Sequence, residues 1–113
     1  VHVDHGITSE CCIEASRLPM RQIANIQPIR KIMYMEVPSS TDWNVSTTNG
    51  FFIPNIFVGI SEKDLSEKVK AVGVYKDVHP RSREVINAMA VLRGSQSGLL
   101  MAESFQMVFG LGV

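Results

Sequence analysis

The stretch that decides the fold is NIFVGISEKDLSEKVKAVGVY, residues 55–75. Its first six residues form a short apolar run with the composition of a buried strand, and the proline just before them is tolerated at a strand start. Ser61 then precedes Asp64 by three residues, which is the pattern of a capping box at a helix N-terminus. The residues that recur at helical spacing and should form the buried face are Leu65, Val69 and Val72. We therefore expect a strand over 55–60 followed directly by a helix that ends near Tyr75.

The same alternation of strand and helix continues toward the C-terminus. The motif HPRS, residues 79–82, precedes a helix for which Ser82 is the predicted N-cap and Gly94 the predicted stop. The predicted buried residues of this helix are Val85, Ile86, Met89 and Leu92. The alternating run ESFQMVF, residues 103–109, predicts a strand. One side of that strand should carry Phe105, Met107 and Phe109, and the other side Ser104 and Gln106.

Upstream, KIMYMEV at 31–37 has the β-favouring composition of another strand. ITSECCIEASRL at 7–18 predicts an amphipathic helix. Its predicted buried face is Ile7, Cys11, Ala15 and Leu18. Cys11 and Cys12 are adjacent, which strains a mutual disulfide, so we expect small core residues and not a redox pair or metal ligands. Three strands and three helices together predict a thin α/β layer fold with an open edge or a missing piece.

Composition limits the functional classes. The chain has 113 residues, 45% hydrophobic and 19% charged, which suits one small globular domain. Eleven basic residues balance eleven acidic ones, so no summed positive field favours nucleic acid or an anionic membrane. No apolar run approaches the roughly 20 residues of a membrane span, and no charged leader precedes an apolar segment. We expect a soluble cytoplasmic protein that binds neither nucleic acid nor membrane.

The motif HVDH at 2–5 is the first candidate for chemistry. It stands just before the first predicted helix, and ends of strands at such junctions are where α/β folds usually bind ligands. Catalytic zinc takes about three protein ligands from His, Asp or Glu, and a neighbouring carboxylate commonly orients a histidine. The candidate residues are therefore His2, Asp4 and His5. The alternative is a polar loop whose histidines are solvated.

Two further segments carry candidate binding residues. SSTDW at 39–43 contains the only tryptophan, Trp43, which would be a core or lid aromatic or a platform on which a sugar stacks. HPRS contains Arg81, whose planar guanidinium at the start of a helix can hold a carboxylate, a phosphate or a sugar hydroxyl. The alternative for Arg81 is a surface ion pair.

Taken together, these segments closely resemble one family over nearly the whole chain. They occur in the order HVDH (2–5), MEVPSSTDWN (35–44), FIPNIFVGIS (52–61), KVKAVGVY (68–75) and HPRSREVINAMAVLRGSQSGLLMAESF (79–105). This order resembles the C-terminal half of the LmbE-like (PIG-L) zinc-dependent N-acetylglucosamine deacetylases. The resemblance implies a Rossmann-like three-layer α/β sandwich, with residues 1–113 forming a partial domain.

The resemblance also implies roles for individual residues. The metal ligand would be His5, holding Zn²⁺ together with ligands from an HPDDE motif that this sequence lacks. The catalytic residues would be His2, which supports the developing oxyanion or acts as an acid, and Asp4, which steadies its polar neighbours. The substrate-binding residues would be Arg81, His79 and Trp43. The substrate would be an N-acetylated amino sugar or its conjugate, and the products a free amine and acetate.

Because the HPDDE motif also supplies the family's general base, the resemblance implies that this chain is inactive by itself. The alternative function is that of a non-catalytic carbohydrate-binding or structural remnant that uses Trp43 and Arg81 without a metal. A sheet that lacks neighbouring strands leaves an exposed edge and an apolar face, so we expect a homo-oligomer or association through that edge. Three departures from the family pattern are the short KDV connection before HPRS, the glycine, Gly59, before Ile60, and the absence from QMVFGLGV, residues 106–113, of the arginine that usually closes the strand after AESF.

Overall fold

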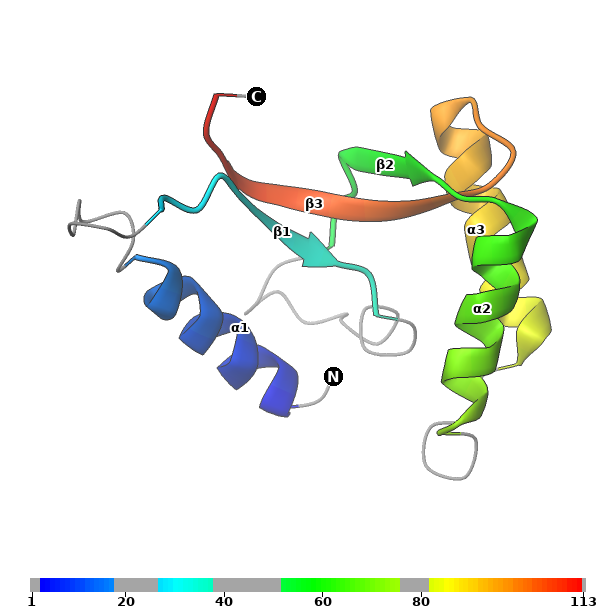
Figure 1. Ribbon diagram of the computed structural model, residues 1–113, viewed down its shortest axis with the longest axis horizontal. Coiled ribbons are helices and arrows are strands. Elements are labelled where there is room, and N and C mark those ends of the chain that lie inside the picture. The colour runs from blue at the N-terminus through cyan, green and yellow to red at the C-terminus, as the bar shows by residue number, and fades with distance from the viewer. Residues whose placement is uncertain (1–2, 18–26, 38–51, 76–81, 113) are drawn as a thin grey trace. The chain divides into compact units, whose positions relative to one another are not determined.

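The computed structural model describes residues 3–17, 27–37, 52–75 and 82–112. The elements are, in chain order, α1 (Val3–Ser16), β1 (Lys31–Met35), β2 (Ile56–Gly59), α2 (Glu62–Gly73), α3 (Arg83–Ser97) and β3 (Ala102–Gly110) (Figure 1). The strands form a three-stranded antiparallel sheet in the order β1-β3-β2, so the fold is a small mixed α/β fold, as the sequence predicts. None of the helices in the described ranges is long and apolar enough to cross a membrane.

The chain divides into two compact units, which are described separately. One unit is Val1–Pro54 with Phe105–Val113, and the other is Asn55–Ser104. All buried apolar side chains of the described residues lie in the second unit, and they are Leu65, Ile86, Ala90 and Ala102. Within that unit α2 packs on α3, as Figure 1 shows in green and yellow, and α3 packs on β2. Half-buried residues close the core around them, namely Ile60, Val69, Val72 and Met101.

The predicted N-caps of both helices in this unit are confirmed. The Asp64 backbone N–H donates to the Ser61 hydroxyl at 3.1 Å, and the Ser61 N–H donates to the Asp64 carboxylate at 2.9 Å. This reciprocal pair is the capping box that starts α2. At the start of α3 the Ser82 hydroxyl accepts from the Val85 N–H at 3.2 Å. Both helices therefore start at the serine N-caps that the sequence predicts.

The predicted end of α3 is wrong. The helix continues past Gly94 to Ser97 and ends at Gly98, which adopts the left-handed conformation with φ 78°. Gly94 is instead buried inside the helix, where a Cβ would lie 2.6 Å from the carbonyl carbon and oxygen of Leu100. The glycine is needed because the chain after α3 folds back across this turn of the helix. The Leu99 N–H then donates to the Gly94 carbonyl at 2.9 Å.

The buried face of α3 also differs from the predicted one. The buried residues are Ile86, Ala90 and Gly94, which recur every four residues, and Met89 is half-buried. The side chains of Val85 and Leu92 were expected in the core but are 46% and 52% exposed. Ile86 was predicted to be buried. The two small residues that follow it at four-residue spacing, Ala90 and Gly94, let the helix approach its neighbours closely, so the buried face runs through them and not through Val85 and Leu92.

In the first unit, β1 pairs with the later part of β3 in antiparallel register. Tyr34 lies opposite Gln106, Met33 opposite Met107, and Ile32 opposite Phe109, so β3 has one extra residue, Val108, at this point. Ile32 and Met33 are consecutive and point to opposite faces of the sheet. Phe109 therefore lies on the face opposite to Met107, and the predicted shared face of Phe105, Met107 and Phe109 is wrong at its last member.

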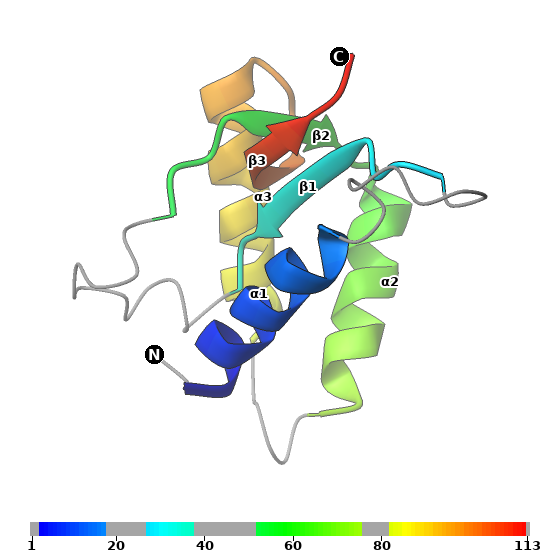
Figure 2. The same cartoon turned by 90° about the vertical axis from the view of Figure 1, so that its left-hand side faces the viewer.

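The first helix, α1, starts at Val3, four residues before the predicted start at Ile7. Figure 2 shows it in blue beside β1. Its more buried positions are Gly6, Ser9, Ile13 and Ser16, and of these Ser16 is the least exposed, at 8%. The predicted face is wrong at Ile7, Cys11 and Ala15, which are exposed, and its fourth member, Leu18, lies outside the described residues. Both cysteines are free and exposed, so their assignment to the core is wrong as well.

Candidate functional site

The HVDH motif is placed by the start of α1. Asp4 and His5 lie in the first turn of the helix and are exposed, so the helix includes the end of the motif that was expected just before it. An acidic residue in the first turn is stabilised by the positive end of the helix dipole, which explains why α1 can begin here. His2 lies outside the described residues.

The helical geometry separates the roles that Asp4 and His5 can take. Successive residues of an α-helix project about 100° apart, so the two side chains diverge and do not point at one common atom. His5 can offer one ring nitrogen to a metal, while Asp4 can orient a neighbouring polar group. In the described part of the chain no three His, Cys, Asp or Glu side chains gather into a possible metal site. The described residues thus fit one ligand of a zinc site that takes about three.

The predicted substrate-binding residues lie outside the described ranges, so their placement is not described. They are Trp43, His79 and Arg81. The described residues resume after Arg81 at Ser82, which caps α3. Of the predicted site residues, the structure therefore places Asp4 and His5 together on one helical turn.

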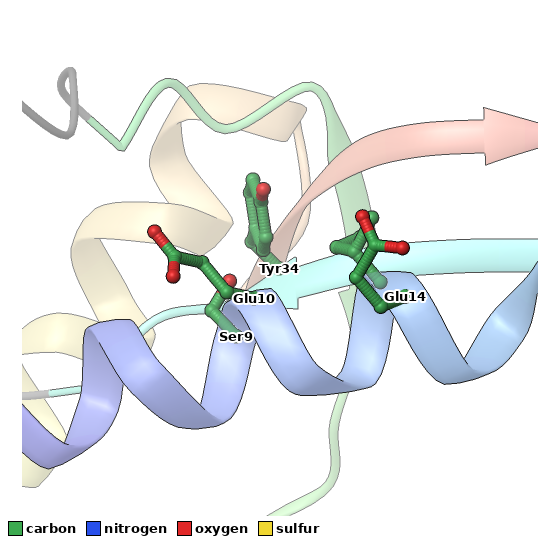
Figure 3. Close-up of a pocket in the computed structure, with 5 residues that line it drawn as sticks. Ser9, Glu10, Glu14 and Tyr34 are labelled. Carbon is green, nitrogen blue, oxygen red and sulfur yellow. The ribbon is translucent and has the colours of Figure 1, made fainter.

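An open groove runs along α1, between the helix and β1. It has a volume of about 350 Å³ and is lined by Ser9, Glu10, Ile13, Glu14 and Tyr34. Figure 3 shows the carboxylates of Glu10 and Glu14 projecting from the helix, with the Tyr34 ring of β1 between them in this view. Glu14 also pairs with Arg17 at 3.3 Å, which neutralises part of the charge at one end of the groove.

The groove lining combines three chemical functions. Carboxylates and a serine hydroxyl accept hydrogen bonds, the tyrosine presents an aromatic face with a polar tip, and Ile13 contributes a half-buried apolar surface. Such a mixture suits a small, hydroxyl-rich or cationic molecule better than a purely apolar one.

None of the groove residues was a predicted site residue. Glu10 and Glu14 are four residues apart in the predicted helix over 7–18. That spacing places both side chains on one side of the helix, so this part of the groove could have been predicted. Tyr34 is distant in the sequence, and its place beside α1 depends on packing that no local pattern specifies. Comparison of the chain with protein-family models, with curated proteins and with solved structures gives no match.

Proposed function

We propose that this chain forms part of a zinc-dependent hydrolase of the LmbE-like (PIG-L) type, which removes the acetyl group from an N-acetylated amino sugar or its conjugate in the cytoplasm. The observation that carries the proposal is the ordered series of motifs, which starts with HVDH, whose Asp4 and His5 are exposed in the first turn of α1, and ends with AESF in β3. In this proposal the chain contributes to a larger Rossmann-like three-layer sandwich.

Contacts join several of the motif segments within the unit Asn55–Ser104. The Lys68 ammonium, from KVKAVGVY, contacts the Glu103 carboxylate of AESF at 2.7 Å. Ile60, from FIPNIFVGIS, donates its N–H to the Met101 carbonyl at 3.1 Å, and Ala102 is 1% exposed. The segments around Ile60 and Lys68 are distant in the sequence from the segment around Ala102, yet they pack against it within the unit Asn55–Ser104.

The chemistry assigned to this chain begins with His5, which would donate a neutral imidazole nitrogen to the metal. Zinc, when bound, supplies Lewis acidity, which makes water a better nucleophile near neutral pH. Asp4 would hold a neighbouring polar group in orientation, and His2 would stabilise negative charge that develops on the acetamide oxygen. The remaining metal ligands and the general base belong, in this proposal, to the family's HPDDE motif, which this chain lacks.

Substrate recognition is assigned to residues of the SSTDW and HPRS motifs. The Arg81 guanidinium would hold sugar hydroxyl or anionic groups with its planar fork, His79 would add a hydrogen bond, and Trp43 would stack on the sugar ring. These three roles follow from the resemblance.

The test is a comparison of variants in a protein that joins this chain to an upstream half bearing HPDDE. His5→Ala should lose both zinc and deacetylation, because it removes a metal ligand. His2→Ala should retain zinc and lose roughly 10²-fold in turnover, which is the scale for one oxyanion-stabilising or proton-transferring group. Asp4→Asn should lose roughly 10- to 100-fold in metal affinity or rate.

Metal content and rate are measured on the same preparations. Thr8→Ala, an exposed change on the same helix, serves as the control and should alter neither. Retention of zinc by His5→Ala together with its loss in His2→Ala would reverse the assigned roles. An inactive joined protein that never holds zinc would refute the proposed function.

The groove beside α1 favours a second candidate function, carbohydrate binding without catalysis. Tyr34 is 41% exposed, so its ring is accessible to a sugar face, and the Glu10 carboxylate can accept hydroxyl hydrogens. If this candidate is correct, N-acetylglucosamine should shift the NMR signals of Tyr34 and Glu10 in this chain alone, and Tyr34→Ala should remove the shifts.

A further inference from the structure

Cys11 and Cys12 are the only cysteines of the chain, and neither lines the groove. Their expected place in the core, where a thiol is inert, is wrong, because both are free and exposed in α1. Exposed thiols exchange with low-molecular-weight disulfides, and a second thiol nearby allows the exchange to end in an internal disulfide. The pair is therefore a candidate oxidation site.

A disulfide between these two neighbours does not fit an α-helix. Consecutive Cα atoms are about 3.8 Å apart, whereas the Cα atoms joined by a disulfide usually lie about 4.4–6.8 Å apart. Consecutive helical side chains also project about 100° apart, so the two thiols diverge. Closing the bond therefore requires new backbone dihedral angles at residues 11 and 12, and these angles break the helical hydrogen bonds that span the pair.

What remains of α1 after such a break is too short to be stable. The helix has 14 residues, Val3–Ser16, and the pair divides it into residues 3–10 and residues 13–16. Isolated helices below roughly 12–15 residues are marginal in water. Tertiary burial adds little, because Ser16 is the only buried residue among the described side chains of α1. A break at the cysteine pair should therefore unfold the whole helix.

We propose that Cys11 and Cys12 form a reversible oxidation site whose internal disulfide unfolds α1. In the first step one cysteine thiolate attacks a low-molecular-weight disulfide such as oxidised glutathione, and one glutathione thiol leaves. The other cysteine then attacks the mixed disulfide and expels the second glutathione thiol. The pair has lost two electrons and two protons, and the oxidised glutathione has become two thiols.

Unfolding of α1 dismantles the groove. Glu10 and Ile13, the residues on either side of the pair, both line it, and Figure 3 shows the Glu10 and Glu14 carboxylates projecting from this part of the helix. Tyr34 belongs to β1, so oxidation separates the two sides of the groove. The inference is independent of the proposed function, because it rests on the cysteine pair and the helix alone.

The test exposes the reduced chain to mixtures of oxidised and reduced glutathione. Mass spectrometry should show a product that has lost two hydrogen atoms and carries no glutathione. In the same samples, NMR should show the backbone signals of α1 at unfolded positions and those of α2 and α3 unchanged, and dithiothreitol should restore α1. Cys11→Ser and Cys12→Ser cannot form the internal bond, so each should carry glutathione and keep α1 helical.

The coupling must be reciprocal, so unfolding of α1 must favour the disulfide. Thr8 is exposed in the same helix, and Thr8→Pro breaks the helix without altering either thiol. It should raise the equilibrium constant for closing the disulfide, measured against glutathione, by about tenfold. Thr8→Ala is the matched control, because it raises helix propensity at the same position and should lower this constant by about twofold.

Three results would overturn the proposal. The first is a chain with the internal disulfide closed in which α1 remains helical. The second is oxidation that ends at mixed disulfides or at cross-linked dimers at every glutathione ratio. The third is a Thr8→Pro variant that unfolds α1 yet closes the disulfide no more readily than the original chain, because the helix would then not oppose the bond.

Discussion

At the scale of single residues, Gly94 is the position where the backbone leaves no room for a side chain. A Cβ there would lie 2.6 Å from two backbone atoms of Leu100 and 2.7 Å from the Met101 nitrogen, and neither can rotate away as a side chain can. Gly94→Ala should therefore displace the turn between α3 and β3 and lower the free energy of unfolding by about 1–3 kcal/mol. Urea unfolding followed by circular dichroism measures the change.

Gly73→Ala is the matched control for this prediction. Gly73 is also helical, but a Cβ there meets no atom within 4 Å. Alanine should stabilise α2 by about 0.5–1 kcal/mol, because glycine has the greater conformational freedom in the unfolded chain. Equal effects of the two substitutions would mean that the close approach at Gly94 does not exist in solution.

Single residues also show where sequence patterns are ambiguous. Glycine after an apolar helical run commonly ends a helix, but it also permits close packing, and the sequence around Gly94 does not distinguish these uses. Cys11 and Cys12 precede Ile13 without a polar residue between them, so several helix faces satisfy the apolar spacing. Asp4 and His5 are exposed in the first turn of α1, and their predicted roles in catalysis and metal binding stay predictions.

At the scale of elements, the capping box makes the stability of α2 depend on pH. The hydrogen bond from the Ser61 backbone, followed by the one from its side chain, holds the pKa of Asp64 below its ordinary value. The stabilisation is therefore complete above the unfolded pKa of about 3.9 and is lost as the pH falls through the lower folded pKa. The midpoint of the Asp64 carboxyl titration, measured by NMR, should lie below about 3.9.

Two variants test this prediction at the level of the helix. The side chain of the Asp64→Asn variant does not titrate. The difference in melting temperature between the original chain and this variant should therefore become smaller as the pH falls below about 4, where Asp64 of the original chain becomes protonated. Ser61→Ala removes the side-chain hydrogen bond and keeps the backbone one, so it should raise the pKa of Asp64 part of the way toward its ordinary value. A midpoint at the ordinary value in the original chain would contradict the capping geometry.

The elements differ in how well local sequence specifies them. β2, α2 and the start of α3 were predicted closely, because strand composition and N-caps act over a few residues. The bulge at Val108 was not predictable from the alternating pattern of β3, since it is specified by the pairing with β1. The groove along α1 was missed for the same reason, because Tyr34 reaches it through tertiary packing.

At the scale of the whole molecule, burial is distributed unevenly between the two units. Leu65, Ile86, Ala90 and Ala102 are all in Asn55–Ser104, whereas the described residues of the other unit have no buried apolar side chain. Local opening costs least where few apolar contacts are lost. Amide hydrogens in the middle of α1 should therefore exchange at least about tenfold faster than those in the middle of α3.

Hydrogen exchange followed residue by residue by NMR measures this difference at a concentration where the chain is monomeric. Both helices have regular backbone hydrogen bonds, so the comparison isolates the contribution of packing. Leu65→Ala should accelerate exchange in α3 and leave exchange in α1 nearly unchanged. Equal protection of the two helices would show that the chain opens as one cooperative unit.

The central position of β3 has a consequence for the order of events during synthesis. β3 pairs with both other strands, yet it follows them in the chain, and roughly 65 residues separate Met35 from Ala102. At about 5–20 residues per second, a ribosome needs roughly 3–13 seconds to make that interval. Throughout this time the apolar strand β1 exists without its partner, so the nascent chain should be a client of chaperones that shield exposed strands until translation reaches β3.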